Sequence, residues 1–200
     1  RPNCKALLAG RRPSRSRDAL RIFERCAHAP PLPAAPRLGK GTASSDPGLE
    51  RAPFVTIAPV SIALASDHAG FALKAMLADE LRAAGHDVLD LGPQDESSVD
   101  YPDYGRALGE ALAAGRAARG IAVCGSGIGI SIAANRVPGV RCALVTSGLM
   151  ARLARQHNDA NCIALGSRII GVAVARDAVR EFLGTEFEGG RHAGRVAKLA

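Results

Sequence analysis

The chain has 200 residues, of which 47% are hydrophobic and 22% charged, and it contains no tryptophan. This length and composition fit one folded domain with an appendage, and no run approaches the roughly 18 consecutive apolar residues of a membrane span. We therefore expect no membrane partner, although the net charge of +7 raises the question of nucleic acid.

The basic charge lies in the first part of the chain. Residues 1–58 hold 11 of the 26 lysines and arginines and 4 of the 19 acids, which leaves 15 of each sign for the rest. Because this Arg-, Ser- and Pro-rich segment lacks apolar periodicity, we predict a disordered extension over residues 1–59 and a folded domain over residues 60–200. The neutral domain predicts no nucleic-acid partner. The extension also resembles an organelle transit peptide, so import is an alternative to the cytoplasm.

From residue 60 onward, short apolar runs alternate with longer helical stretches. The predicted strands are SIALAS (61–66), HDVLDLG (86–92), GIAVCG (120–125), VRCALV (140–145) and NCIALG (161–166). Such continuous apolar runs are typical of strands that are buried on both faces. Helices are predicted over residues 71–84, 104–114, 128–135, 148–156 and 172–183. The alternation predicts an α/β fold, a three-layer α/β/α sandwich with a five-stranded parallel sheet.

Polar residues at the strand ends are the candidates for a site, because ligands of such sheets bind beyond the carboxyl ends of the strands. Asp67 and His68 follow the first strand, and RQHNDAN, with His157 closing a helix, precedes the fifth. A lone histidine at such a position is more often structural. We nevertheless expect His68 and His157 to face one cleft, where groups that titrate near neutrality can move protons. His86, in a polar turn, is expected to be solvated.

The loop CGSGIG follows the third strand. Gly125, Gly127 and Gly129 are spaced as GxGxG, so the match to a dinucleotide-binding turn, GxGxxG, is weak. Glycines nevertheless let backbone N–H groups crowd around an oxyanion. Ser126 adds a hydroxyl donor to this loop.

The five cysteines, at positions 4, 26, 124, 142 and 162, form no CxxC pair and have no histidine at zinc-site spacing. This favours reduced thiols and no metal. Cys142 and Cys162 lie inside apolar runs, where a thiol behaves as a small hydrophobe. Cys124 instead opens onto the glycine loop, where a thiol becomes more acidic and can act as a base or nucleophile.

The C-terminal stretch EGGRHAGRVAKL places Arg191 and Arg195 four residues apart, on one face if a helix begins near Gly190. Two guanidinium groups side by side suit a phosphate or carboxylate, and a solvated basic face is an equal alternative. Arg152 and Arg155, in the preceding helical stretch, are expected to form a solvated face.

Taken together, these stretches resemble one family, the RpiB/LacAB type of sugar-phosphate isomerases, which includes the type B ribose-5-phosphate isomerases. The resemblance spans about residues 60–200 and rests on several motifs in the same order. These are SDHAG (66–70), DYPDY (100–104), CGSGIGISIAANRVPGVRCALV (124–145), RQHNDANCIALGSRIIG (155–171) and FEGGRHAGRV (187–196).

The resemblance implies the interconversion of D-ribose 5-phosphate and D-ribulose 5-phosphate through an enediolate, in the non-oxidative pentose phosphate pathway, without a metal or organic cofactor. Cys124 would be the base that moves a proton between the first two sugar carbons. His157 would help to open the furanose ring, with Asp67 assisting at the ring oxygen or hydroxyls. Ser126 and the amides of Gly125, Gly127, Ile128 and Gly129 would hold the enediolate charge.

The same resemblance implies the remaining contacts and the assembly. His68, Arg191 and Arg195 would bind the phosphate, while Asn158 and Arg168 would line the sugar site. Family members are homodimers or dimers of dimers in which residues of both subunits complete each site, and we expect the same here. Two alternatives stay open: an isomerase of six-carbon substrates such as galactose or allose 6-phosphate, and a phosphosugar-binding module without catalysis.

Overall fold

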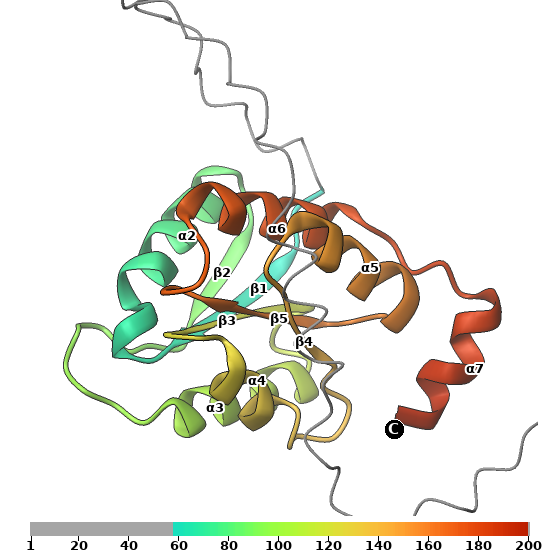
Figure 1. The fold of residues 1–200 in the computed structure, drawn as a ribbon, viewed down its shortest axis with the longest axis horizontal. Helices are drawn as coiled ribbons and strands as arrows, with labels where there is room; N and C mark the ends of the chain where they lie inside the picture. The colour runs from blue at the N-terminus through green and yellow to red at the C-terminus, as the bar shows by residue number, and fades with distance from the viewer. Residues whose placement is uncertain (1–57, 200) are drawn as a thin grey trace, which may run out of the picture. The chain divides into compact units, whose positions relative to one another are not determined.

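The computed structural model describes residues 58–199. In this part of the chain one sheet has the strand order β2-β1-β3-β5-β4, with every neighbouring pair parallel (Figure 1). The strands are β1 (Ser61–Ser66), β2 (Asp87–Asp90), β3 (Arg119–Cys124), β4 (Cys142–Leu144) and β5 (Cys162–Gly166). The predicted five-stranded parallel sheet is confirmed. The extension predicted over residues 1–59 lies, except for its last two residues, outside the described residues and stays a prediction.

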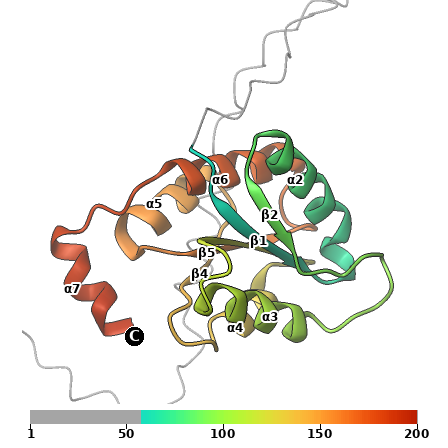
Figure 2. The ribbon, with the colours of Figure 1, turned by 180° about the vertical axis from the view of Figure 1, so that it is seen from behind.

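Helices cover both faces of the sheet and make the three predicted layers. They are α2 (Phe71–Ala83), α3 (Tyr101–Ala113), α4 (Ile128–Ala134), α5 (Gly148–Asn158) and α6 (Val172–Gly184), with a short 3₁₀ turn, η1 (His68–Gly70), before α2. Figures 1 and 2 show α2, α5 and α6 on one face and α3 and α4 on the other.

Each face of the sheet has its own apolar core, because side chains alternate along the strands. Ile62 and Leu64 of β1 point into the core under α2, α5 and α6. Ala63 and Ala65 point into the core under α3 and α4. The second core is built from small residues, and Gly105 lets α3 approach α4, since a Cβ there would lie 2.8 Å from the Ile130 carbonyl oxygen.

The strand order determines where a ligand can bind. From β1 the chain crosses to β2 on one side, whereas β3 lies on the other side of β1. A crevice is expected between the carboxyl ends of two such strands. Asp67 follows β1 and Cys124 ends β3, and the pairing of Ser66 with Val123 brings these two ends level.

Three sequence-based expectations were wrong in detail. α3 begins at Tyr101 rather than at residue 104, because Pro102 fits the first turn, where a missing N–H costs no hydrogen bond. His86 is buried, and its Nδ1 accepts a hydrogen bond from the Val60 N–H at 3.2 Å. Arg155 is also buried and donates to Asp159 and to backbone carbonyls rather than to water.

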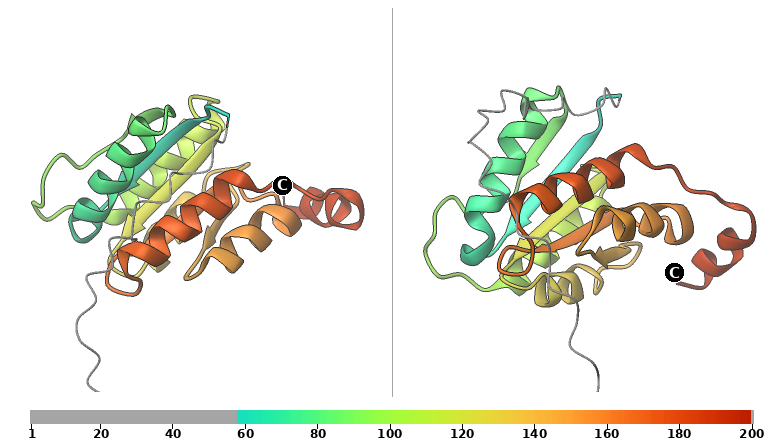
Figure 3. Two further views of the ribbon diagram at one scale, coloured as in Figure 1. Left: turned by 90° about the horizontal axis from the view of Figure 1, so that it is seen from above. Right: turned by 45° about the horizontal axis from the view of Figure 1, so that its top comes forward.

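The C-terminal segment stands apart from the helix layers, beyond the end of α5 (Figures 1 and 3). It consists of η2 (Gly190–His192), α7 (Ala193–Val196) and η3 (Ala197–Leu199). Helical structure does begin at Gly190, but as two short pieces, so that Arg191 lies on a 3₁₀ turn and Arg195 on the α-helix that follows it. Within residues 58–199, no helix is both long and apolar enough to span a bilayer.

Candidate functional site

The loop after β3 has a conformation that requires glycine at its centre. Gly127 has φ +78°, in the left-handed region. A Cβ on this residue would lie 2.5 Å from Leu144 Cδ1 and 3.1 Å from the Gly166 nitrogen. Because both the backbone angle and the surrounding space exclude a side chain, Gly127 holds the loop close to β5.

Cys124 is held by this same loop. Its side chain is buried, and the Gly127 N–H donates a hydrogen bond to Sγ at 3.1 Å. The Ile128 N–H donates to Ser126 Oγ at 3.3 Å. Two of the amides that were expected to hold an enediolate charge therefore already have partners within the loop. The Ser126 hydroxyl accepts from Ile128, which leaves its proton for a ligand.

Asp67 and His68 lie beside this loop, at the carboxyl end of β1. The Asp67 N–H donates to the Val123 carbonyl oxygen at 3.1 Å, and its buried carboxylate accepts from the Gly70 N–H at 2.9 Å. His68 Nδ1 lies 3.3 Å from the nitrogen and from the oxygen of Val99. The structure thus brings Asp67 and His68, as expected, to the edge of the sheet that the carboxyl ends of the strands form, where Cys124 also lies.

Ser167 was missed by the sequence analysis, although it stands in the motif GSRIIG. Its hydroxyl lies 2.8 Å from the Ala69 carbonyl oxygen and 3.2 Å from that of Cys124, and so links the loops after β1, β3 and β5. Arg168 follows it and is exposed. Its Nη1 would lie 3.5 Å from a Cβ on Gly125, which puts a positive charge next to the glycine loop.

Tyr101 was also missed, and the motif DYPDY was the signal for it. A Cβ on Gly129 would lie 2.6 Å from the Tyr101 ring, so the ring packs directly on the first turn of α4. Tyr101 is 43% exposed. It forms an aromatic wall next to the loop that carries Cys124.

His157 and Asn158 lie at the opposite edge of the sheet, which the amino ends of the strands form. The expectation that His157 shares a cleft with His68 is therefore wrong for a single chain. Both residues end α5, which leads into the amino end of β5. Asn161 lies at that end, where its carbonyl oxygen accepts from the Gly120 N–H at 2.8 Å. Since a parallel strand rises about 3.3 Å per residue, β5 separates the two sets of residues by about 13 Å.

At this second edge, His157 belongs to a cluster with the C-terminal segment. Its ring stacks on that of His192, with centroids 4.4 Å apart and planes inclined by 6°. Glu188 Oε2 lies 3.9 Å from Nε2 of each histidine. Arg191 donates from Nε to His192 Nε2 at 3.3 Å. Through His192 the cluster links His157 with Arg191, two residues that the sequence had placed in separate motifs.

His157, Glu188 and His192 also have ligand atoms within 4.8 Å of one another, the one such trio among residues 58–199. Two histidines and a carboxylate are a familiar zinc set. Here the rings are parallel, so their nitrogen lone pairs do not converge, and Arg191 occupies His192 Nε2. This geometry favours an imidazole stack over a metal site.

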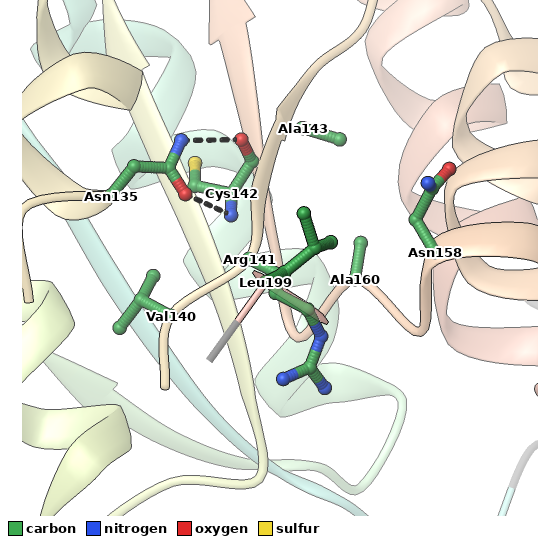
Figure 4. A pocket seen from close by; sticks show the side chains of 8 residues that line it. All are labelled: Asn135, Val140, Arg141, Cys142, Ala143, Asn158, Ala160 and Leu199. Atoms are coloured by element: carbon green, nitrogen blue, oxygen red, sulfur yellow. Dashed lines mark hydrogen bonds between the residues drawn. The ribbon is translucent and has the colours of Figure 1, made fainter. Parts of the chain in front are cut away.

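A pocket of about 340 Å³ opens beside β4 (Figure 4). Its lining is Asn135, Val140, Arg141, Cys142, Ala143, Asn158, Ala160 and Leu199. Arg141 is already paired with Asp159, and the Asn135 amide pairs with the backbone of Cys142. Of the predicted site residues only Asn158 borders this pocket, so it is separate from the loop that holds Cys124.

The chain matches the family model described as Ribose/Galactose Isomerase over residues 62–199. It is 43% identical over 138 residues to the ribose-5-phosphate isomerase B of Escherichia coli, which covers 69% of this chain and 93% of the relative. The matched region is the part that forms the sheet, its helices and the C-terminal segment.

Solved structures agree with this match. A ribose-5-phosphate isomerase B of Clostridium thermocellum is 51% identical, with a TM-score of 0.68 over 69% of this chain and 93% of that one. The enzyme of Mycoplasma genitalium, solved with bound ribulose-5-phosphate, is 40% identical, with a TM-score of 0.66 over 69% of this chain and 92% of that one.

The geometry around Gly127 yields a prediction about stability. Gly139 has nearly the same backbone angle, φ +81°, but its Cβ would meet nothing within 4 Å. Gly139→Ala should therefore cost only the left-handed strain, about 1–2 kcal/mol, whereas Gly127→Ala should cost about 1–3 kcal/mol more because of crowding. Urea unfolding at one protein concentration measures the difference. Equal losses would contradict the close packing of this loop.

Proposed function

The chain belongs to the ribose/galactose isomerase family, and from this we propose that it interconverts D-ribose 5-phosphate and D-ribulose 5-phosphate. The observation that carries the proposal is the buried thiol of Cys124, which receives the Gly127 N–H inside a glycine loop at the switch point of the sheet. A backbone N–H that donates to the sulfur favours its thiolate form, which can act as a base. Other donors of the same loop can stabilise the negative charge that develops on the substrate.

We propose that His157 and Asp67 open the sugar ring. His157 donates a proton to the ring oxygen O4 as the C1–O4 bond breaks, and Asp67 supports the loss of the proton from O1. The position of His157 at the partly exposed end of α5 supports this role, because an imidazole can exchange its proton with water between turnovers. The product of this step is the open-chain aldehyde.

Cys124 then takes the proton from C2, and the electron pair forms the C1–C2 double bond of an enediolate. The same sulfur returns a proton to C1, while a proton passes from O2 to O1, so that the carbonyl moves to C2. The Ser126 hydroxyl and the amides of Gly125 and Gly129 stabilise the developing negative oxygen. The Gly127 N–H supports the sulfur instead, because it already donates to Sγ.

The phosphate is proposed to bind to His68, Arg191 and Arg195, with Asn158 and Arg168 along the sugar. Guanidinium groups suit phosphate because they donate from a planar fork. Arg191 uses Nε for His192, which leaves its two terminal nitrogens for the ligand. Arg168 beside Gly125 adds positive charge close to where the enediolate forms.

We propose a homodimer, or a dimer of such dimers, in which each site uses both chains. Cys124, Asp67 and Ser126 lie at one edge of the sheet and His157 at the other, so a second copy is needed to bring them together. Exposed apolar side chains on α4 and α5 offer a surface for this contact. They are Ile128, Ile132, Leu149, Met150 and Leu153.

A six-carbon substrate is the second candidate, since the family description includes galactose. The five-carbon substrate is favoured because the relative solved with a sugar phosphate holds ribulose-5-phosphate at 40% identity. A coupled assay that compares ribose, galactose and allose phosphates tests this choice. A clearly higher kcat/KM for a six-carbon sugar would overturn it, and binding without turnover would favour a non-catalytic module.

We propose the cytoplasm as the location and the non-oxidative pentose phosphate pathway as the setting. Cys124, Cys142 and Cys162 are free thiols, which supports a reducing compartment. The contribution of residues 1–57 to location lies outside the described residues.

Replacing the proposed base should abolish most turnover. Cys124→Ala should lower kcat for ribose 5-phosphate about 10²- to 10⁴-fold, the usual contribution of a positioned base. Cys142→Ala removes another buried thiol on the same face of the sheet and should leave kcat within about twofold. Retention of full turnover by Cys124→Ala would rule out this base.

His157 should matter for ring opening and not for proton transfer at carbon. Ribulose 5-phosphate is an open chain, since its O5 carries the phosphate and cannot close a furanose ring. His157→Ala should therefore lower ribose 5-phosphate turnover about 10²-fold or more. Deuterium uptake from D₂O at C1 of ribulose 5-phosphate, followed by NMR, should persist within several-fold of wild type. An equal loss of both rates would contradict a role confined to the ring.

A further inference from the structure

His192 differs from its neighbours in the C-terminal segment. Between residues 190 and 199 it is the one buried side chain, at 5% exposure, while the rest of the segment faces solvent or is partly covered. A buried histidine needs a partner for its ring nitrogens and its faces. The partners of the His192 ring therefore indicate what this residue does.

One face of His192 packs on His157. The rings are 4.4 Å apart between centroids and nearly parallel. The backbone holds the two residues in this register, because the Glu188 N–H donates to the Gln156 carbonyl oxygen at 3.1 Å and the His192 N–H to that of Gly189 at 2.9 Å. His192 thus fixes the plane of the ring that is proposed to protonate the sugar.

The Nε2 edge of His192 is occupied by Arg191. Arg191 Nε–H donates to His192 Nε2 at 3.3 Å, which requires that nitrogen to be an acceptor and puts the ring proton on Nδ1. Burial lowers the pKa of His192, its neighbours His157, Arg191 and Arg195 lower the pKa further, and Glu188 opposes them. The hydrogen bond from Arg191 and the lowered pKa both favour the neutral form of the His192 ring.

We propose that His192 is a positioning residue that couples the phosphate-binding Arg191 to the ring-opening His157. This inference rests on the proposed function. Arg191 holds the phosphate with its terminal nitrogens and the acceptor edge of His192 with Nε. His192 in turn holds the plane of His157. Binding of the phosphate thereby fixes the imidazole at the angle from which it protonates the ring oxygen.

Two substitutions of His192 separate its two contacts. His192→Gln keeps an oxygen that can accept from Arg191 but removes the aromatic face. It should lower kcat for ribose 5-phosphate about 10- to 100-fold, the effect of a misplaced catalytic group, and leave KM within about twofold. Deuterium uptake into ribulose 5-phosphate should stay within about threefold of wild type, because that step needs no ring opening.

His192→Phe keeps the aromatic face but offers no acceptor to Arg191. It should raise KM for both phosphosugars about tenfold, because a hydrogen bond to a charged group is lost. The kcat ratio between ring opening and deuterium uptake should stay close to that of wild type. Both variants are made in the full chain, and circular dichroism checks that each is folded.

His86→Gln is the matched control, since His86 is buried to a similar degree, at 6% exposure, and has no proposed role in the site. If both His192 variants lower turnover and deuterium uptake equally, as a general loss of stability would, the inference is overturned. If His157→Ala still lowers ribose 5-phosphate turnover more than deuterium uptake, only the role of His192 is overturned and the ring-opening role of His157 stands. If His157→Ala does not separate them, the ring-opening role fails and the inference fails with it.

Discussion

The direction of the strands is the constraint on which the rest of this structure depends. In a parallel sheet all strands begin at one edge and end at the other. A residue immediately before one strand therefore lies at the opposite edge from a residue immediately after a neighbouring strand. Cys124 ends β3, and His157 lies before β5, which runs beside β3 in register. About 13 Å of sheet therefore lies between the two proposed proton-transfer groups. A reaction that needs both must use two chains.

Each edge is built for a different task. The edge with Cys124 is closely packed, since Gly127 fits only without a side chain and Ser167 links the loops after β1, β3 and β5. The proposed base at this position gains orientation, which lowers the barrier because the reacting groups are already in place. The other edge carries the histidine stack and two arginines on a segment that packs little on the domain. Within one chain, the proposed proton donor and the arginines thus lie apart from the thiol.

Much of this could be predicted from sequence. Continuous apolar runs predicted five parallel strands because both faces of such a sheet are covered, and the glycine loop singled out Cys124 among the five cysteines. The alternation of strands and helices also implied that His157 lies far from Cys124. The sequence analysis nevertheless placed both at one cleft, because it considered only that polar residues lie next to the strands. The burial of His86, the bond from Arg155 to the Thr185 carbonyl oxygen and the stack of His157 on His192 depend on contacts between elements distant in the chain. Local pattern carries no information about such contacts.

The most direct measurement of a shared site is complementation between two inactive chains. Cys124→Ala and His157→Ala chains are unfolded together, refolded and assayed with ribose 5-phosphate. Random pairing of the two chains makes half of the dimers mixed. If each site draws its thiol from one chain and its imidazole from the other, each mixed dimer has one intact site. The mixture should then recover about one quarter of wild-type activity. A mixture no more active than its components would contradict a site built from both edges.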